Sequence, residues 1–184
     1  MTINNTFGVS IIPDNEVERV KKLHDYQILQ SEDNGPFKHI AALAAHVFKV
    51  PIALVSFVDS ERVFFKGNVG MEDVTDVERG ISLCSLSVMR QQATVFKDAL
   101  KEPCLLKNPL VAGEFGLRFY AAVPLTTHDG YNLGSVCIVD KEPREFGIDD
   151  QITLEYMAKL AMDELELWKC KLYSESRLQD SSAQ

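Results

Sequence analysis

The segments Leu117-Arg-Phe-Tyr-Ala-Ala-Val-Pro-Leu125 and Leu133-Gly-Ser-Val-Cys-Ile-Val-Asp140 carry most of the information on the fold. Both are apolar and of strand length. Between them lies His128-Asp-Gly130. An Asp-Gly pair is typical of a tight turn, because glycine adopts a positive φ without steric cost. The sequence therefore predicts a β-hairpin with strands over 117–126 and 132–140.

Upstream, a second hairpin is expected, with strands over 51–59 and 62–67. The other predicted elements are a short strand over 94–98 and helices over 14–29, 36–48, 81–90 and 148–175. Two hairpins favour antiparallel pairing. We therefore expect an α+β fold with one mainly antiparallel sheet of about six strands. Helices flank this sheet, and the N- and C-terminal helices pack together on one face.

The first and last helices have apolar stripes at helical spacing. In the first helix we expect a stripe of Val17, Val20, Leu23 and Leu29, with Glu16, Glu18, Arg19, Lys21 and Lys22 facing water. The last helix repeats apolar residues to Trp168 and continues to about 175, so its stripe is a packing face and a candidate dimer seam. The expected division is a tail over 1–13, a domain over 14–170 and a C-terminal extension over 171–184.

The composition is that of one globular domain: 184 residues, 46% hydrophobic, with a net charge of -8. No basic stripe for nucleic acid is visible. No apolar run reaches the length of a membrane span, and no secretory signal is evident. Four scattered cysteines give no zinc spacing, so we expect no metal site and a reduced, cytoplasmic protein.

Several pieces occur in the order found in a known family. They include Phe48-Lys-Val-Pro-Ile-Ala-Leu-Val-Ser-Phe-Val-Asp59, Asn108-Pro-Leu-Val111, Arg118-Phe-Tyr120 and Pro124-Leu125. From about residue 15 to 167 the chain resembles bacterial GAF domains, of the type found beside histidine kinases and diguanylate cyclases. The resemblance implies signal sensing, with a small-molecule cavity on the sheet face away from the terminal helices. It also implies homodimerisation through those helices and an output partner.

By analogy with ligand-binding members of that family, we place Phe57, Tyr120 and Cys137 on the cavity side of the sheet. Cys84 would approach from the covering helix, and Arg118 would bind an anionic ligand at the rim. The alternatives are ordinary core aromatics and an Arg118–Glu114 ion pair. The sequence identifies neither the ligand nor a cofactor, and it indicates no catalytic residue.

An enzymatic alternative comes from the same resemblance. Some GAF proteins are free methionine-(R)-sulfoxide reductases, and Cys84 and Cys104 fall near two of that family's three cysteines. No cysteine lies between residues 68 and 81, where the third belongs, and Tyr120 stands where that family has a carboxylate. We therefore prefer a sensory domain that binds a small molecule or a partner and signals through its terminal helices. The reductase is the rival.

Overall fold

The computed structural model describes residues 3–32 and 35–182 and has one sheet of six strands in the order β3-β2-β1-β6-β5-β4. All neighbouring strands are antiparallel. The strands are β1 (Ile52–Val58), β2 (Arg62–Val69), β3 (Asp76–Glu78), β4 (Thr94–Phe96), β5 (Phe119–Thr126) and β6 (Asn132–Asp140). The predicted α+β fold and both hairpins are confirmed, and Gly130 in the β5–β6 turn has a φ of +90°.

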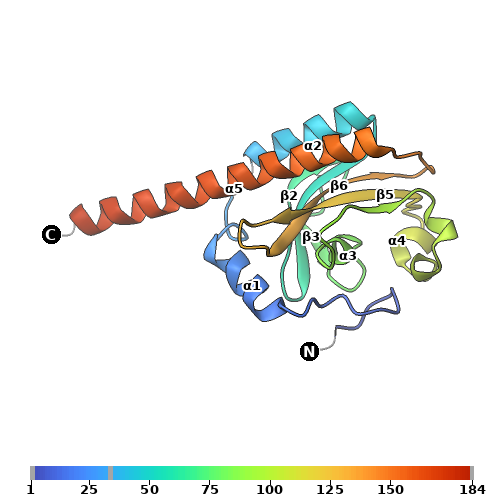
Figure 1. Ribbon diagram of the computed structural model, residues 1–184, viewed down its shortest axis with the longest axis horizontal. Coiled ribbons are helices and arrows are strands. Elements are labelled where there is room, and N and C mark those ends of the chain that lie inside the picture. The colour runs from blue at the N-terminus through green and yellow to red at the C-terminus, as the bar shows by residue number, and fades with distance from the viewer. Residues whose placement is uncertain (1–2, 33–34, 183–184) are drawn as a thin grey trace.

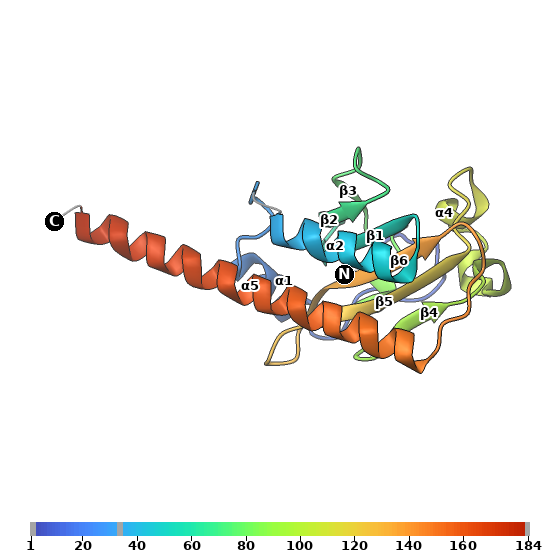
Figure 2. The same ribbon diagram turned by 90° about the horizontal axis from the view of Figure 1, so that it is seen from above.

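Helices cover the sheet on both faces, as Figure 1 shows. One face carries α2 (Gly35–Phe48) and α5 (Ile148–Ser182), which lie side by side in both views (Figures 1 and 2). The opposite face carries α3 (Cys84–Ser87), α4 (Pro109–Ala112) and the two 3₁₀ turns Ala99–Lys101 and Pro103–Leu105. The three central strands β1, β6 and β5 are thus almost wholly buried, which explains their nearly continuous apolar sequences.

Several segments differ from their predicted form, among them the helix expected over 81–90, which is the four-residue α3. The first helix, α1 (Glu16–Asp25), ends four residues earlier than expected, and Gln27 follows with a φ of 53°. The segment 71–80, for which neither a strand nor a helix was predicted, contains the edge strand β3, paired with β2.

Residues 3–13, expected as a tail, lie against the layer of α3 and α4 that covers this face of the sheet. Phe7 and Ile11 are buried, and the backbone amide of Thr6 donates to the carbonyl of Gly80 at 3.1 Å. The side-chain amide of Asn108, just before α4, donates to the hydroxyl of Thr6 at 2.9 Å. These contacts make the N-terminal segment part of the cover of this face.

The expectation that Glu16 and Arg19 face water was wrong. Arg19 is fully buried, Glu16 is 9% exposed, and Val17 of the predicted stripe is 79% exposed. Arg19 donates to Glu16 through Nε and Nη2, each at 2.9 Å. Arg79, also fully buried, donates to both oxygens of Glu16, at 2.5 and 3.1 Å. The helix turns its charged face inward because Arg79, distant in sequence, completes the network.

The network also joins separate segments of backbone. Arg19 Nη1 donates to the carbonyl of Val58 at 2.6 Å, at the end of β1. Arg79 Nη2 donates to the carbonyl of Ile11 at 2.9 Å. The N-terminal segment, α1, β1 and the link from β3 to α3 therefore meet at one buried ionic centre.

The last helix crosses the sheet and continues beyond it. Its buried residues pack on the strands: Leu154, Met157, Ala158, Ala161 and Leu165. Trp168 then donates through Nε1 to the carbonyl of Tyr26 at 2.9 Å, which joins α5 to the end of α1. The N- and C-terminal helices therefore meet here, while α2 runs along α5. Most side chains after this point are exposed, and the helix projects from the domain (Figure 2).

Candidate functional site

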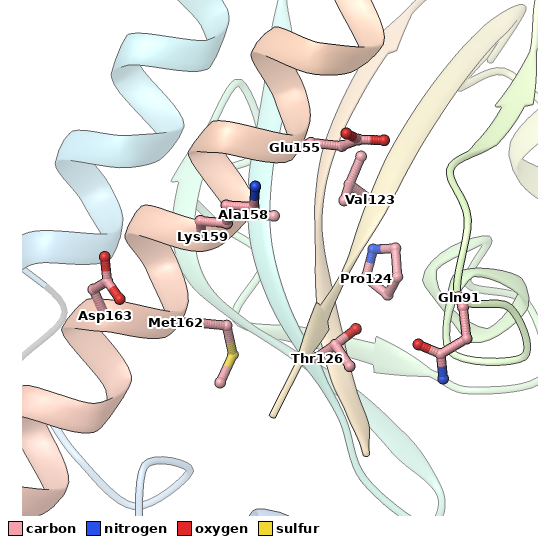
Figure 3. Close-up of a pocket in the computed structure, with 9 residues that line it drawn as sticks. All are labelled: Gln91, Val123, Pro124, Thr126, Glu155, Ala158, Lys159, Met162 and Asp163. Atoms are coloured by element: carbon pink, nitrogen blue, oxygen red, sulfur yellow. The ribbon is translucent and has the colours of Figure 1, made fainter. Parts of the chain in front are cut away.

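Two hollows lie on opposite faces of the sheet. One of them, of about 310 Å³, is a surface groove between α5 and β5 (Figure 3), and it is not the largest surface hollow of the described residues. Glu155, Lys159 and Asp163 line it from α5, and Val123, Pro124 and Thr126 line it from β5. Gln151 donates to Glu155 at 2.9 Å, so one of the carboxylates is already engaged. The groove is open and of mixed charge, and it encloses nothing.

The smaller hollow is an interior cavity between the sheet and the layer of α3 and α4. Its volume is about 40 Å³, and it is lined by Leu54, Phe65, Met71, Val77, Ser82, Leu83, Cys84, Leu110, Phe115, Leu117, Tyr120, Cys137 and Val139. This has room for a few water molecules, whereas pockets for drug-sized ligands usually measure about 300–1,000 Å³. A larger ligand therefore requires the covering layer to move outward.

Polar side chains gather at the sheet side of this cavity, within an otherwise apolar core. The sulfur atoms of Cys84 and Cys137 lie 3.9 Å apart, and both thiols are buried. Beside them, the hydroxyls of Ser56 and Ser135 lie 3.1 Å apart across the β1–β6 pair. The buried hydroxyl of Tyr120 has no hydrogen-bond partner among the residues that the structure describes. We call these five residues the thiol cluster.

The two thiols of this cluster have opposite tendencies to ionise. The hydrogen bond from Cys137 lowers the pKa of Cys84 to about 6, against the effect of burial, and the nearby hydroxyls of Ser56, Tyr120 and Ser135 act in the same direction. The same interaction raises the pKa of Cys137 well above its usual value. Burial raises the pKa of Tyr120 as well. The two thiols therefore titrate as a coupled pair, in which loss of the proton from Cys84 is favoured over loss from Cys137.

Three of the predicted site residues, Cys84, Tyr120 and Cys137, meet in this cluster. The placement of Phe57 beside them was wrong. Phe57 lies on the helix face of the sheet and packs edge-on against Phe37 of α2, with ring centroids 5.6 Å apart. The proposed ligand-binding roles of Cys84, Tyr120 and Cys137 stay predictions.

Arg118 immediately precedes β5 and is half-buried. Its Nη1 donates to the carbonyl of Val111, at 3.0 Å, and to that of Leu117, at 2.8 Å. The first of these bonds ties β5 to α4 in the covering layer. The guanidinium of Arg118 thus binds backbone carbonyls, whereas we expected it to bind an anionic ligand.

Sequence reasoning missed Ser56 and Ser135 as members of the cluster. Each is a hydroxyl within a strand that is otherwise nearly all apolar, and the two are direct partners in the β1–β6 register. A polar residue in a fully buried strand needs a partner. That requirement is the signal that could have assigned these residues to one site.

The reductase alternative rests on Cys84 and Cys104, but the structure does not bring these two cysteines together at the cavity. Cys84 contacts Cys137, while Cys104 is partly buried in the covering layer and is absent from the cavity lining. The lining residues include no carboxylate. An amino-acid substrate would lack an acidic partner for its ammonium group in this cavity.

The family model described as "GAF domain" matches residues 36–165. The chain belongs to the GAF family. Over 177 residues it is 33% identical to a cyclic di-GMP phosphodiesterase of Pseudomonas aeruginosa. That match covers 91% of this chain but 30% of the relative, so the chain spans less than a third of the relative's length.

Solved GAF structures share the fold at low identity. The GAF domain of an Acinetobacter phosphoenolpyruvate-protein phosphotransferase has a TM-score of 0.61 and 15% identity, covering 84% of this chain and 95% of that one. The free methionine-R-sulfoxide reductase of Neisseria meningitidis also has a TM-score of 0.61, with 17% identity and coverages of 93% and 99%. The same architecture therefore supports both signalling and enzymatic proteins.

Within residues 3–32 and 35–182, no helix combines the length and apolar character that a membrane crossing requires. The same residues contain no group of three or more His, Cys, Asp or Glu side chains arranged to hold a metal ion.

Proposed function

We propose that this GAF domain is a sensory domain in which the state of the interior cavity is passed to α5 and from there to an output partner. The observation that carries this proposal is the position of the central strands. Ala122 and Cys137 face the cavity layer, while Ala121 and Ile138, their neighbours on β5 and β6, face the layer of α5. A shift of these strands therefore acts on both layers. Since α5 continues beyond the domain, it is the natural route outward.

The proposed input is a small molecule that enters once the cover of α3 and α4 opens. The hydroxyl of Tyr120, which has no hydrogen-bond partner within residues 3–32 and 35–182, supports this, because a buried polar group without a partner is unfavourable and an incoming ligand could satisfy it. The proposed output is cyclic di-GMP signalling in the cytoplasm. Its support is the 33% identity to a cyclic di-GMP phosphodiesterase over 91% of this chain.

The test fills the cavity without needing the natural ligand. Ser82→Phe places a bulky side chain in the cavity lining. We expect amide hydrogen exchange to change in α3 and α4 and also in α5 beyond Leu165. Cys104→Ser, in the same layer but outside the lining, is the matched control. Exchange changes confined to α3 and α4 would contradict the proposal.

A second measurement denatures the same purified protein and uses mass spectrometry to identify any small molecule released from the cavity. We expect release from the natural sequence and from Cys104→Ser, and loss of that molecule from Ser82→Phe. Equal release from all three proteins would assign the molecule to another site.

We further propose that the domain dimerises through the outer faces of α2 and α5. Exposed apolar side chains gather there: Leu43, Val47, Ile152, Tyr156, Leu160 and Leu167. A second copy of the chain is the occupant that buries such a face symmetrically. This dimer would place two copies of α5 side by side where they leave the domain.

Leu160→Glu is expected to weaken this dimer by about tenfold or more, or about 1.4 kcal/mol, because a carboxylate would be buried in the apolar interface. Sedimentation velocity over a range of concentrations measures the change. Leu106→Glu is the matched control, since Leu160 is 49% and Leu106 48% exposed, and Leu106 lies on the opposite side of the sheet. Identical association of the two variants would rule out this interface.

A further inference from the structure

The two thiols of the thiol cluster belong to different layers, one in the sheet and one in its cover. Cys137 lies in the middle of β6, paired with Leu54 of β1 on one side and Ala122 of β5 on the other. Cys84 begins α3, a helix of four residues in the covering layer. Their sulfur atoms are 3.9 Å apart, whereas a disulfide bond measures about 2.05 Å. A displacement of α3 towards the sheet can bring the two sulfur atoms together.

The cavity gives these thiols access to a small molecule. Both cysteines line it, and its outer wall includes the partly exposed side chains of Met71, Leu110 and Phe115. Its volume of about 40 Å³ admits a molecule of two or three heavy atoms. The buried hydroxyl of Tyr120 lies on the same cavity wall and meets no partner at full hydrogen-bond geometry in the described part of the chain.

We propose that Cys84 and Cys137 form a redox-active dithiol that reduces a small hydroperoxide, hydrogen peroxide being the best fit, and closes to a disulfide. The size of the cavity selects the oxidant, and the pair of thiols supplies the two electrons. This inference concerns chemistry at the cluster and does not depend on the proposed sensory function.

The reaction has two steps. In the first, the Cys84 thiolate attacks one peroxide oxygen, so that an S–O bond forms and the O–O bond breaks. The leaving hydroxide takes the proton of Cys137 and departs as water. Cys84 is then a sulfenic acid, and Cys137 is a thiolate.

In the second step, the Cys137 thiolate attacks the sulfur of Cys84. The S–S bond forms, the S–O bond breaks, and hydroxide leaves as water with the proton that Cys84 released on ionising. In sum, two thiols and one hydrogen peroxide molecule give one disulfide and two waters, while an organic hydroperoxide would give one water and one alcohol. The product fixes α3 to the centre of the sheet across the cavity.

The test uses the full chain with Cys104→Ser and Cys170→Ser, so that Cys84 and Cys137 are the only cysteines that remain. On treatment with one equivalent of hydrogen peroxide, we expect both thiols to be lost, with a mass decrease of about 2 Da. Peptide mapping without reductant should show residues 84 and 137 linked within one chain. A dithiol reductant should restore both thiols.

A bulky aromatic hydroperoxide is the probe for the size of the cavity, and it should oxidise the folded protein much more slowly than hydrogen peroxide does. Denatured protein, in which the cavity is absent, should lose this preference. Adding Cys137→Ser should stop the reaction of Cys84 at the sulfenic acid, which a dimedone adduct reports.

Three results would overturn the proposal. The first is that the thiols of the folded protein persist at peroxide levels that oxidise the denatured chain. The second is a disulfide that joins two chains. The third is that both hydroperoxides oxidise the folded protein at equal rates. The variant with both buried thiols intact decides these outcomes, so the inference remains testable even if substitutions at Cys84 or Cys137 prevent folding.

Discussion

Glu16→Gln is expected to lower the free energy of unfolding by about 3–5 kcal/mol, the range for removing one partner from a buried ion pair. Glu16 is the shared carboxylate of Arg19 and Arg79, whose side chains are both fully buried. A neutral amide leaves two guanidinium groups without a counter-charge inside the protein. Urea denaturation followed by circular dichroism measures the change.

Glu18→Gln is the matched control, because Glu18 lies on the same helix and is exposed. Its effect should fall within about 0.5 kcal/mol, as for most surface substitutions. A loss at Glu16 no greater than that at Glu18 would show that the buried network contributes little to stability.

The same carboxylate makes stability depend on pH. Burial raises the pKa of Glu16, but the hydrogen bonds and charges of Arg19 and Arg79 outweigh it, so the net pKa lies below the usual 4.5. A folded-state pKa below the unfolded one gives stability that is present above pH 4.5 and lost as pH falls through the folded value. Acid denaturation curves should therefore be steeper for the natural sequence than for Glu16→Gln.

The ionic centre also shows what local sequence patterns can and cannot predict. Glu16, Arg19 and Leu23 have helical spacing, so a buried face through them was as regular as one through Val17 and Val20. Hydrophobicity favoured burial of the face with Val17 and Val20. The face with Glu16 and Arg19 is buried instead, because Arg79, sixty-three positions from Glu16, brings its charge to the same point. No pattern within one helix contains that partner.

Five of the six strands were predicted to within two residues at each end, since runs of β-branched and aromatic residues and the Asp129-Gly130 turn are local signals. The three-residue edge strand β3 was missed. Which way each strand faces was harder. All seven residues of β1 are buried, so alternation separates its residues into two sets without showing which set meets the helices. The serine at 56 belongs to the cavity set, and its polarity marks that face more reliably than the aromatic at 57 does.

Phe57→Ala is expected to lower the free energy of unfolding by about 3–5 kcal/mol, the range for removing a buried phenylalanine. Phe57 is fully buried and meets Phe37 at an interplanar angle of 85°, so its ring joins β1 to α2. Truncation leaves a void between the sheet and the helix layer, where rigid backbone on both sides limits collapse. Urea denaturation provides the measurement.

Tyr120→Phe on the opposite face is the informative counterpart. Its hydroxyl is buried without a partner in the described residues, so removing it should cost less than about 1 kcal/mol or even stabilise the protein. Phe57→Ala should leave the peroxide reactivity of the thiols unchanged in the folded protein, whereas Tyr120→Phe should slow it. If Phe57→Ala instead altered the thiols and spared stability, the ring would act on the cavity side after all. The two substitutions together therefore separate the face that holds the helices from the face that holds the chemistry.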